Sequence, residues 1–129
     1  MAECGDLAAG RTTDLIKWTP KGPNSEVFCI LYESSLIGHL VVDELRHMDA
    51  MSLYSIFIYT EFQGNGHGTA AMKCLEAIVS DRALGQLFLV PHEVANTPIE
   101  ALRKWYYGMG FSDSGNERGR MEKRIRKSL

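Results

Sequence analysis

A glycine-rich segment lies between an apolar stretch with strand character and a stretch with the period of a helix. The apolar stretch covers residues 54–59, the glycine-rich segment covers residues 63–69 (QGNGHGT), and the helical period begins near Gly68. A glycine loop that leaves a strand and opens a helix lets backbone N–H groups converge at the positive end of the helix dipole, which favours a phosphate or pyrophosphate. A tight strand-to-helix turn also needs such glycines, because glycine adopts positive φ without strain. On either interpretation the segment predicts a strand, a loop and a helix in the middle of the chain.

The remaining hydrophobic pattern predicts an α/β fold around this unit. Residues 1–25 are broken by Pro20, Gly22 and Pro23, which leaves room for one small strand or helical turn around residues 15–18. Further along the chain, the pattern predicts a β-hairpin (27–32 and 36–42), a strand (52–59), a helix ending near residue 84, a strand (87–90), a helix (98–107) and a last strand (120–126). Thr97 is expected to cap the second helix, with Pro98 at its first position.

Length and composition predict one compact domain over residues 1–129, with 45% hydrophobic residues for a core. No N-terminal signal-like segment and no apolar run near the roughly 20 residues of a membrane helix occurs, so we expect a cytoplasmic protein without a membrane partner. The three cysteines are widely spaced, with no C-x-x-C pair and no histidine cluster nearby. This spacing predicts neither a disulfide framework nor a metal site, and it favours Cys29 and Cys74 as small core residues.

The formal net charge of −2 hides an asymmetry along the chain. Residues 1–117 carry 8 Lys/Arg against 15 Asp/Glu, whereas residues 118–129 carry 6 against 1. The acidic body suits a cationic amine, and the basic end could meet phosphates or lie as a solvated strand edge. The basic end lacks interleaved aromatic residues and any known binding motif, so nucleic acid is not the expected partner.

Two common nucleotide loops do not fit the glycine-rich segment. A dinucleotide-binding G-x-G-x-x-G has a third glycine where this chain has Thr69, and it usually lies near the N-terminus. A Walker-type loop ends in G-K-[ST], but the first lysine after the loop is Lys73.

A third interpretation fits better. Gln63, Gly66 and Gly68 occupy the fixed positions of the Q-x-x-G-x-G/A signature, and the chain here resembles the GNAT N-acetyltransferases. Forty residues later, residues 104–111 (KWYYGMGF) are similar to the family's Y-x-x-x-G-F box, with Tyr106 five positions before the phenylalanine. The hairpin glycine Gly38 and the terminal strand around residues 121–123 also look like family features, and the resemblance covers roughly residues 26–126.

The resemblance implies a GNAT-type fold, which is a mixed, mostly antiparallel sheet flanked by helices, and acetyl-CoA as co-substrate without a metal. The strand before the loop would pair with the pantetheine arm, and the loop N–H groups would hold the pyrophosphate. A side chain at Gly66 or Gly68 would crowd that approach, whereas the side chain of His67 is expected to face solvent. The implied cofactor-binding residues are Phe57, Ile58, Tyr59, Gln63, Gly64, Asn65, Gly66, His67, Gly68, Thr69 and, at a shifted spacing, Asn96.

For catalysis, the resemblance implies that Tyr106 is the general acid that protonates the departing CoA thiolate, with Tyr107 as the alternative one residue along. A general base must deprotonate the acceptor amine, which is mostly charged at pH 7. Glu61 lies in the turn near the expected cofactor and is the first candidate. Other candidates are strand-end residues that could face the acceptor: Asp43, Glu44, His92 and Glu93.

The acceptor stays open at this level. Family members usually begin with a strand and two helices that wall the acceptor site, but here about 25 residues precede the hairpin. A shallow acceptor side would admit a protein lysine or N-terminus, whereas a homodimer partner would complete a pocket for a small amine. The alternative function is a catalytically inactive module that binds acyl-CoA for sensing, and the intact Gln63, Gly66, Gly68 and Tyr106 favour the enzyme.

Overall fold

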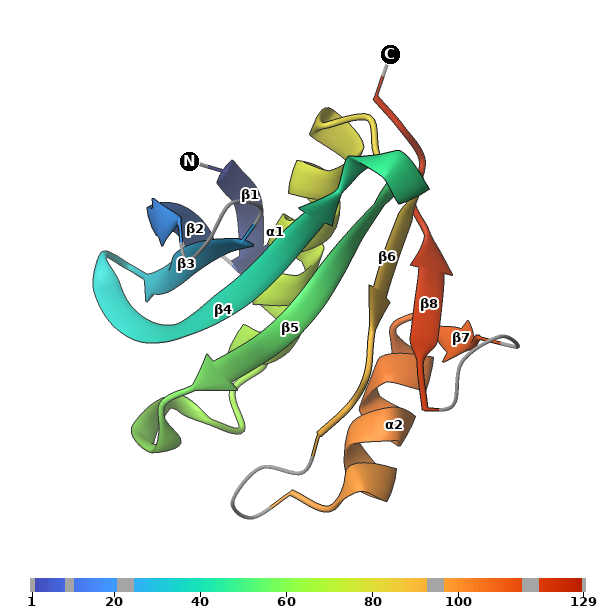
Figure 1. The fold of residues 1–129 in the computed structure, drawn as a ribbon. Helices are drawn as coiled ribbons and strands as arrows, with labels where there is room; N and C mark the ends of the chain where they lie inside the picture. Colours follow the sequence, from blue (N-terminus) through green and yellow to red (C-terminus); the bar gives the residue numbers. More distant parts are fainter. Residues whose placement is uncertain (1, 9–10, 21–24, 93–96, 115–118, 129) are drawn as a thin grey trace.

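The computed structural model describes residues 2–8, 11–20, 25–92, 97–114 and 119–128, with the backbone alone for residues 2–8, 11–14 and 16–20. Eight strands of these residues form one sheet in the order β1-β2-β3-β4-β5-β6-β8-β7 (Figure 1). All neighbouring strands run antiparallel except β5 and β6, which are parallel. The elements are β1 (Ala2–Ala8), β2 (Arg11–Pro20), β3 (Ser25–Tyr32), β4 (Ser35–Leu45), η1 (Arg46–Met48), β5 (Ala50–Ile58), η2 (Thr60–Phe62), α1 (His67–Asp81), β6 (Gln86–Leu89), α2 (Ile99–Gly108), β7 (Ser112–Asp113) and β8 (Met121–Arg124).

The hairpin β3–β4 is confirmed, with slightly longer strands than predicted. Its two turn residues, Glu33 and Ser34, both have positive φ (50° and 69°). Positive φ at both central positions gives the turn the twist that antiparallel strands need. The next strand, β5, lies so close to β4 that a Cβ at Gly38 would be only 2.1 Å from the carbonyl oxygen of Phe57. Glycine at position 38 is therefore required for this approach.

Helix α1 lies behind β4 and β5 in Figure 1 and packs against β1, β2, β5 and β6. Its apolar stripe is buried, as the 3.6-residue period predicts. The helix ends at Asp81, earlier than predicted, because Ala83 turns into the left-handed region (φ 57°) and the N–H of Leu84 returns to the carbonyl of Val79. Cys74 lies in the core on α1 as expected, but it is disulfide-bonded, so the prediction of no disulfide was wrong there. In the described residues, no helix is long and apolar enough to span a membrane.

The prediction for the first 25 residues was wrong. Instead of one small strand or helical turn, this region forms β1 and β2, which extend the sheet beyond β3. The register of β2 on β3 runs from Thr13 opposite Tyr32 to Pro20 opposite Glu26, and Leu15 is fully buried. Pairing with the two neighbouring strands, β1 and β3, stabilises β2, and the strand-breaking residues fall at or beyond its end.

The second half of the sheet carries α2, β7 and β8. Helix α2 begins one residue later than predicted, since Pro98 is its N-cap with extended backbone (ψ 153°) and Ile99 is its first residue. The predicted last strand shortens to β8, and the two-residue strand β7 was not predicted.

The basic C-terminal segment lies against the acidic body. The ammonium of Lys123 contacts the carboxylate of Glu76 at 2.9 Å and donates to the carbonyl of Met109 at 2.8 Å. Beyond β8, Lys127 pairs with Asp49 at 3.0 Å. The charge asymmetry of the sequence is thus partly neutralised within the fold, and β8 lies between β6 and β7 rather than as a solvated edge of the sheet.

Candidate functional site

The parallel strands β5 and β6 separate partway along the sheet. Their pairing runs from Ala50 opposite Gln86 to Leu53 opposite Leu89. Strand β6 ends there, whereas β5 continues to Ile58. Figure 1 shows the two strands diverging toward the loop that precedes α1. Beyond Leu53, the edge of β5 that would have met β6 is therefore open.

Two hydrogen bonds define which backbone groups face this open edge. The N–H of Tyr59 donates to the carbonyl of Ile37 at 2.8 Å, toward β4. The side-chain amide of Gln63 donates to the carbonyl of Ile58 at 2.7 Å, on the other side. Because successive residues of a strand direct their backbone groups to opposite edges, Ile56 and Ile58 face the open edge, while Phe57 and Tyr59 face β4.

The glycine-rich loop connects the end of β5 to α1. Gly64 and Gly66 have φ of 83° and 81°, a conformation that glycine adopts readily, and a Cβ at either would meet no atom within 4 Å. Gly66 is the N-cap of α1, and its carbonyl accepts the N–H of Ala70 at 3.0 Å. The N–H groups of the first turn have no partner within the helix, so the loop presents donors and the positive end of the dipole to an open space.

A cleft of about 310 Å³ lies between this loop, β5 and α2. Its volume is within the range of small-molecule sites. It is lined by Ile56, Phe57, Ile58, Phe62, Gln63, Gly64, Gly66, His67, Gly68, Thr69, Thr97, Leu102 and Trp105. The fold thus brings together most of the cofactor-binding residues inferred from the sequence. Tyr59 and Asn65 do not line this cleft, and Asn96 lies outside the described residues.

Trp105 is a residue of the cleft that sequence reasoning missed. Its indole Nε1 donates to the hydroxyl of Thr69 at 3.1 Å. Its ring lies over Gly68, where a Cβ would be 3.1 Å from the nearest ring atom. The small size of Gly68 therefore leaves room for the indole of Trp105. From the sequence, room for the cofactor was the only reason inferred for this glycine. The only sequence signal for a role of Trp105 in the site was its position directly before the Y-x-x-x-G-F box.

His67 was expected to face solvent, and this expectation was wrong. Its side chain is 9% exposed, and its ring centroid lies 4.4 Å from that of Tyr32. His67 is the first residue of α1, and its ring packs beside that of Tyr32, the last residue of β3. His67 still lines the cleft.

Tyr106 lines a second, smaller cavity of about 70 Å³, which shares Ile56 and Leu102 with the cleft. The tyrosine is 5% exposed, and its ring packs against Phe111 at a centroid distance of 5.6 Å. Burial raises the pKa of the phenol to about 12. The phenol therefore keeps its proton over the physiological pH range.

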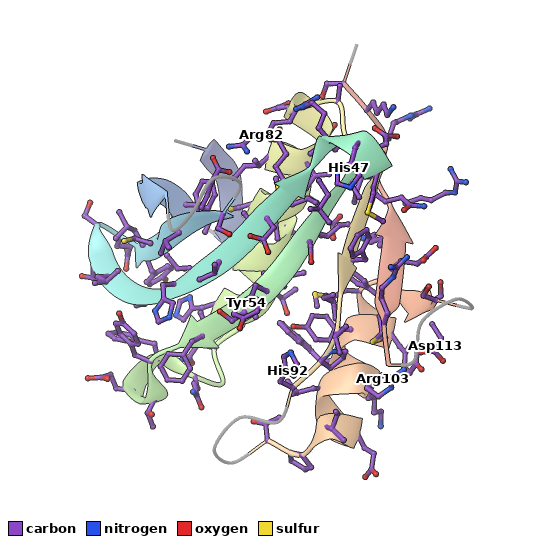
Figure 2. All side chains as sticks on the ribbon, in the orientation of Figure 1. His47, Tyr54, Arg82, His92, Arg103 and Asp113 are labelled. Carbon is purple, nitrogen blue, oxygen red and sulfur yellow. The ribbon has the colours of Figure 1, made fainter. Side chains whose placement is uncertain are left out.

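The wall of the smaller cavity also includes Tyr54 and His92. Figure 2 shows Tyr54 on β5 and His92 beyond the end of β6, on either side of the region where these strands diverge. Tyr107, the alternative acid, points elsewhere, because its hydroxyl donates to Asp113 at 2.7 Å on the surface of α2 and β7.

The candidate bases are widely separated. Glu61 is exposed on η2 and lines neither cavity. Asp43 accepts a hydrogen bond from Ser25. Partial burial acts to raise the pKa of Glu44, but hydrogen bonds from two arginines, Arg46 and Arg82, outweigh it and lower the pKa. Among the described candidates, His92 alone shares a cavity with Tyr106, and Glu93 lies outside the described residues.

The comparisons with known proteins agree with this geometry. The model of the acetyltransferase (GNAT) family matches residues 5–111 of this chain. The chain therefore belongs to the GNAT acetyltransferase family. A search of curated proteins found no match.

Solved structures share the fold. A GNAT family acetyltransferase from Elizabethkingia anophelis with acetyl-CoA bound is 14% identical at a TM-score of 0.68, over 88% of this chain and 98% of that one. The ribosomal-protein-S18-alanine N-acetyltransferase from Escherichia coli is 17% identical at a TM-score of 0.65, over 84% and 74%. The PaiA N-acetyltransferase from Thermoplasma acidophilum, solved in complex with coenzyme A, is 17% identical at a TM-score of 0.61 over 79% of this chain, which spans 62% of that protein. The expected GNAT-type fold is thus confirmed.

Proposed function

We propose that this chain is an N-acetyltransferase that transfers the acetyl group of acetyl-CoA to a primary amine. The observation that carries the proposal is that the cleft beside the glycine loop and the cavity of Tyr106 lie next to each other at the open edge of β5, where they share Ile56 and Leu102. A pyrophosphate at one end and a thioester at the other would fit this arrangement. Membership of the GNAT acetyltransferase family supports the reaction class.

The cofactor would be held mostly by backbone. Ile56 and the N–H of Ile58 present strand-edge groups to the pantetheine amides, as a neighbouring strand would, whereas the carbonyl of Ile58 already accepts a hydrogen bond from Gln63. The loop from Gly64 to Thr69 presents N–H groups to the pyrophosphate, whose charge the helix dipole also favours. Trp105 forms an apolar wall of the cleft. We keep Asn65 and Asn96 as proposed cofactor contacts from the family resemblance, whereas the N–H of Tyr59 donates to Ile37 and is not available to the pantetheine arm.

In the reaction, a neutral amine attacks the thioester carbonyl, so a C–N bond forms and the C–S bond breaks. The phenol of Tyr106 donates its proton as negative charge develops on the departing sulfur. The raised pKa keeps the proton in place until that moment.

We propose His92 as the base that removes the amine proton, in place of Glu61. Its support is the cavity that it shares with Tyr106, since acid and base must reach the same reacting centre. An imidazole can exchange a proton near neutral pH. The exposed position of Glu61 on η2 suits a contact with the rest of the acceptor.

The test combines binding and turnover on one preparation. Calorimetry should detect acetyl-CoA binding, and free CoA thiol should appear when a panel of small amines and lysine peptides is added. Acetyl-CoA at about 100 times its dissociation constant should stabilise the fold by roughly 2.7 kcal/mol. Binding without turnover on any amine would instead indicate the acyl-CoA-sensing alternative, and no binding at millimolar ligand would refute both.

A further inference from the structure

Three ring side chains form a cluster on the face of β4 and β5 that points away from the core. The ring centroids of His39, Phe57 and Tyr59 lie 5.8–6.2 Å apart. Leu40 and Ile56, their strand neighbours, pack in the core, so strand alternation directs His39 and Phe57 to the opposite face. Among the described residues, no helix lies in front of β4 and β5 in Figure 1. Phe57 is 37% exposed there, so this ring cluster is accessible.

The ring cluster is continuous along β5 with the cavity of Tyr106. Ser55 lines that cavity, and its side chain shares a strand face with Phe57. Phe57 and Tyr59 follow Ser55 by two and four residues, which corresponds to about 7 and 13 Å along a strand. A molecule that reaches into the small cavity could therefore extend over the rings.

One exposed carboxylate near the ring cluster suits a cation. Of the other Asp/Glu between residues 35 and 72, Glu44 pairs with Arg46 and Arg82, and Asp49 pairs with Lys127. Glu61 follows Tyr59 by two residues and is exposed. Aromatic faces attract ammonium groups through the ring quadrupole, and a nearby carboxylate adds to that attraction.

We propose that the ring cluster of His39, Phe57 and Tyr59 binds the distal ammonium of an aliphatic diamine or polyamine whose other amine enters the small cavity to be acetylated. The inference rests on the proposed acetyltransferase function and names its acceptor class. The preferred acceptor then carries a second positive charge about 7–13 Å along the strand from the part that lies beside Ser55. Glu61 contributes to binding that charge rather than to proton transfer.

The first experiment compares α,ω-diamines of two to ten carbons with the monoamine of the same chain length. The measured quantity is kcat/KM at saturating acetyl-CoA. A diamine of intermediate length should exceed its monoamine by roughly 2–30-fold, the range that a cation–π contact supplies. Shorter diamines should lose this advantage because their second charge cannot reach Phe57. If each diamine and its monoamine have the same kcat/KM at every chain length, the inference is overturned and the acetyltransferase function is not.

Two variants at one position provide a matched control. Phe57→Leu removes the aromatic face but retains an apolar side chain, and Phe57→Tyr retains the ring. The ratio of diamine to monoamine kcat/KM should fall toward one in Phe57→Leu and persist in Phe57→Tyr. Thermal unfolding and acetyl-CoA affinity are measured on both, so a folding defect would be visible. Equal ratios in the two variants would contradict a role for the ring.

A binding measurement decides the inference independently of turnover. Calorimetric titration of octane-1,8-diamine into protein saturated with CoA should give a heat that Phe57→Leu loses and Phe57→Tyr keeps. Absence of that heat would overturn the inference. If no amine is acetylated, the proposed function fails, but the titration still tests the ring cluster. Acetylation of basic peptides with neither turnover nor binding of diamines would also overturn it.

Discussion

The indole of Trp105 and the hydroxyl of Thr69 join the two helices beside the cleft, with a hydrogen bond of 3.1 Å between Nε1 and Oγ1. Thr69 lies in the first turn of α1, where the cleft is expected to receive a pyrophosphate, and Trp105 precedes the tyrosine that lines the smaller cavity. This contact couples the proposed cofactor end of the site to the proposed reaction end.

Removing that hydrogen bond should loosen both ends. Thr69→Val keeps the shape of the side chain but leaves the partly buried indole N–H unpaired, which should lower the free energy of unfolding by about 1–3 kcal/mol. Thr69→Ser keeps the hydroxyl and serves as the control. Urea unfolding with and without acetyl-CoA gives the comparison, and equal stabilities for Val and Ser would show that the bond contributes little.

Two substitutions of Gly66 that differ only in charge test whether the loop binds an anion. Its φ of 81° is a conformation that Asp and Asn tolerate better than other side chains, and no atom lies within 4 Å of a Cβ there. Gly66→Asp and Gly66→Asn should therefore fold comparably. Asp should weaken acetyl-CoA binding by roughly 10²-fold more than Asn, because like charges in contact cost several kcal/mol. Similar affinities for the two variants would mean that the pyrophosphate lies elsewhere.

The identity of the base follows from a pair of substitutions. His92→Gln should lower kcat by roughly 10²–10⁴-fold. Glu61→Gln should raise KM for a diamine and leave kcat within a few-fold. The reverse pattern, with kcat lost in the glutamate variant alone, would return the base role to Glu61.

Local signals in the sequence predicted the central unit well. The φ values of Gly64 and Gly66 and the apolar stripe of α1 depend on neighbouring residues, so their pattern is visible without the fold. The hairpin turn at Glu33 and Ser34 followed from the two apolar runs on either side. Strand β2 was missed because its stability comes from pairing with β3 rather than from its own composition.

The site was predictable only where residues are close in the chain. Thr69 and Trp105 are 36 positions apart, so their contact needs the relative placement of two helices. The burial of His67 on α1 depends on its contact with Tyr32 on β3. Glu61 was predicted as the base because it lies close to the glycine loop in the sequence. In the structure it follows the end of β5 and does not line the cavity of Tyr106.

The substitution Tyr106→Phe tests whether Tyr106 is the general acid or only a packing residue. The ring and its contact with Phe111 remain, so acetyl-CoA affinity should change little. Loss of the proton donor should lower kcat by roughly 10²–10⁴-fold. Turnover and affinity are measured on the same preparation. Unchanged kcat would refute the acid role, and a parallel loss of affinity and stability would identify Tyr106 as a packing residue.

The same variant tests the burial of the phenol through the pH dependence of stability. Burial raises the pKa of Tyr106 from its ordinary value of 10 to about 12. Below pH 10 the folded and unfolded states both hold the proton, so the full stability is present. Between pH 10 and 12 the unfolded chain releases the proton while the folded protein retains it, and stability falls by about 1.36 kcal/mol per pH unit.

The free energy of unfolding of the native protein should therefore drop by about 2–3 kcal/mol more than that of Tyr106→Phe between pH 9 and pH 12. Urea unfolding at closely spaced pH values measures the difference, which cancels the titration of other groups common to both proteins. Tyr54→Phe, at a position that is 60% exposed, is the matched control for the loss of a phenol. Parallel curves for the native protein and Tyr106→Phe would mean that water reaches the phenolate in the folded state, so the cavity of Tyr106 would be more open than the fold indicates.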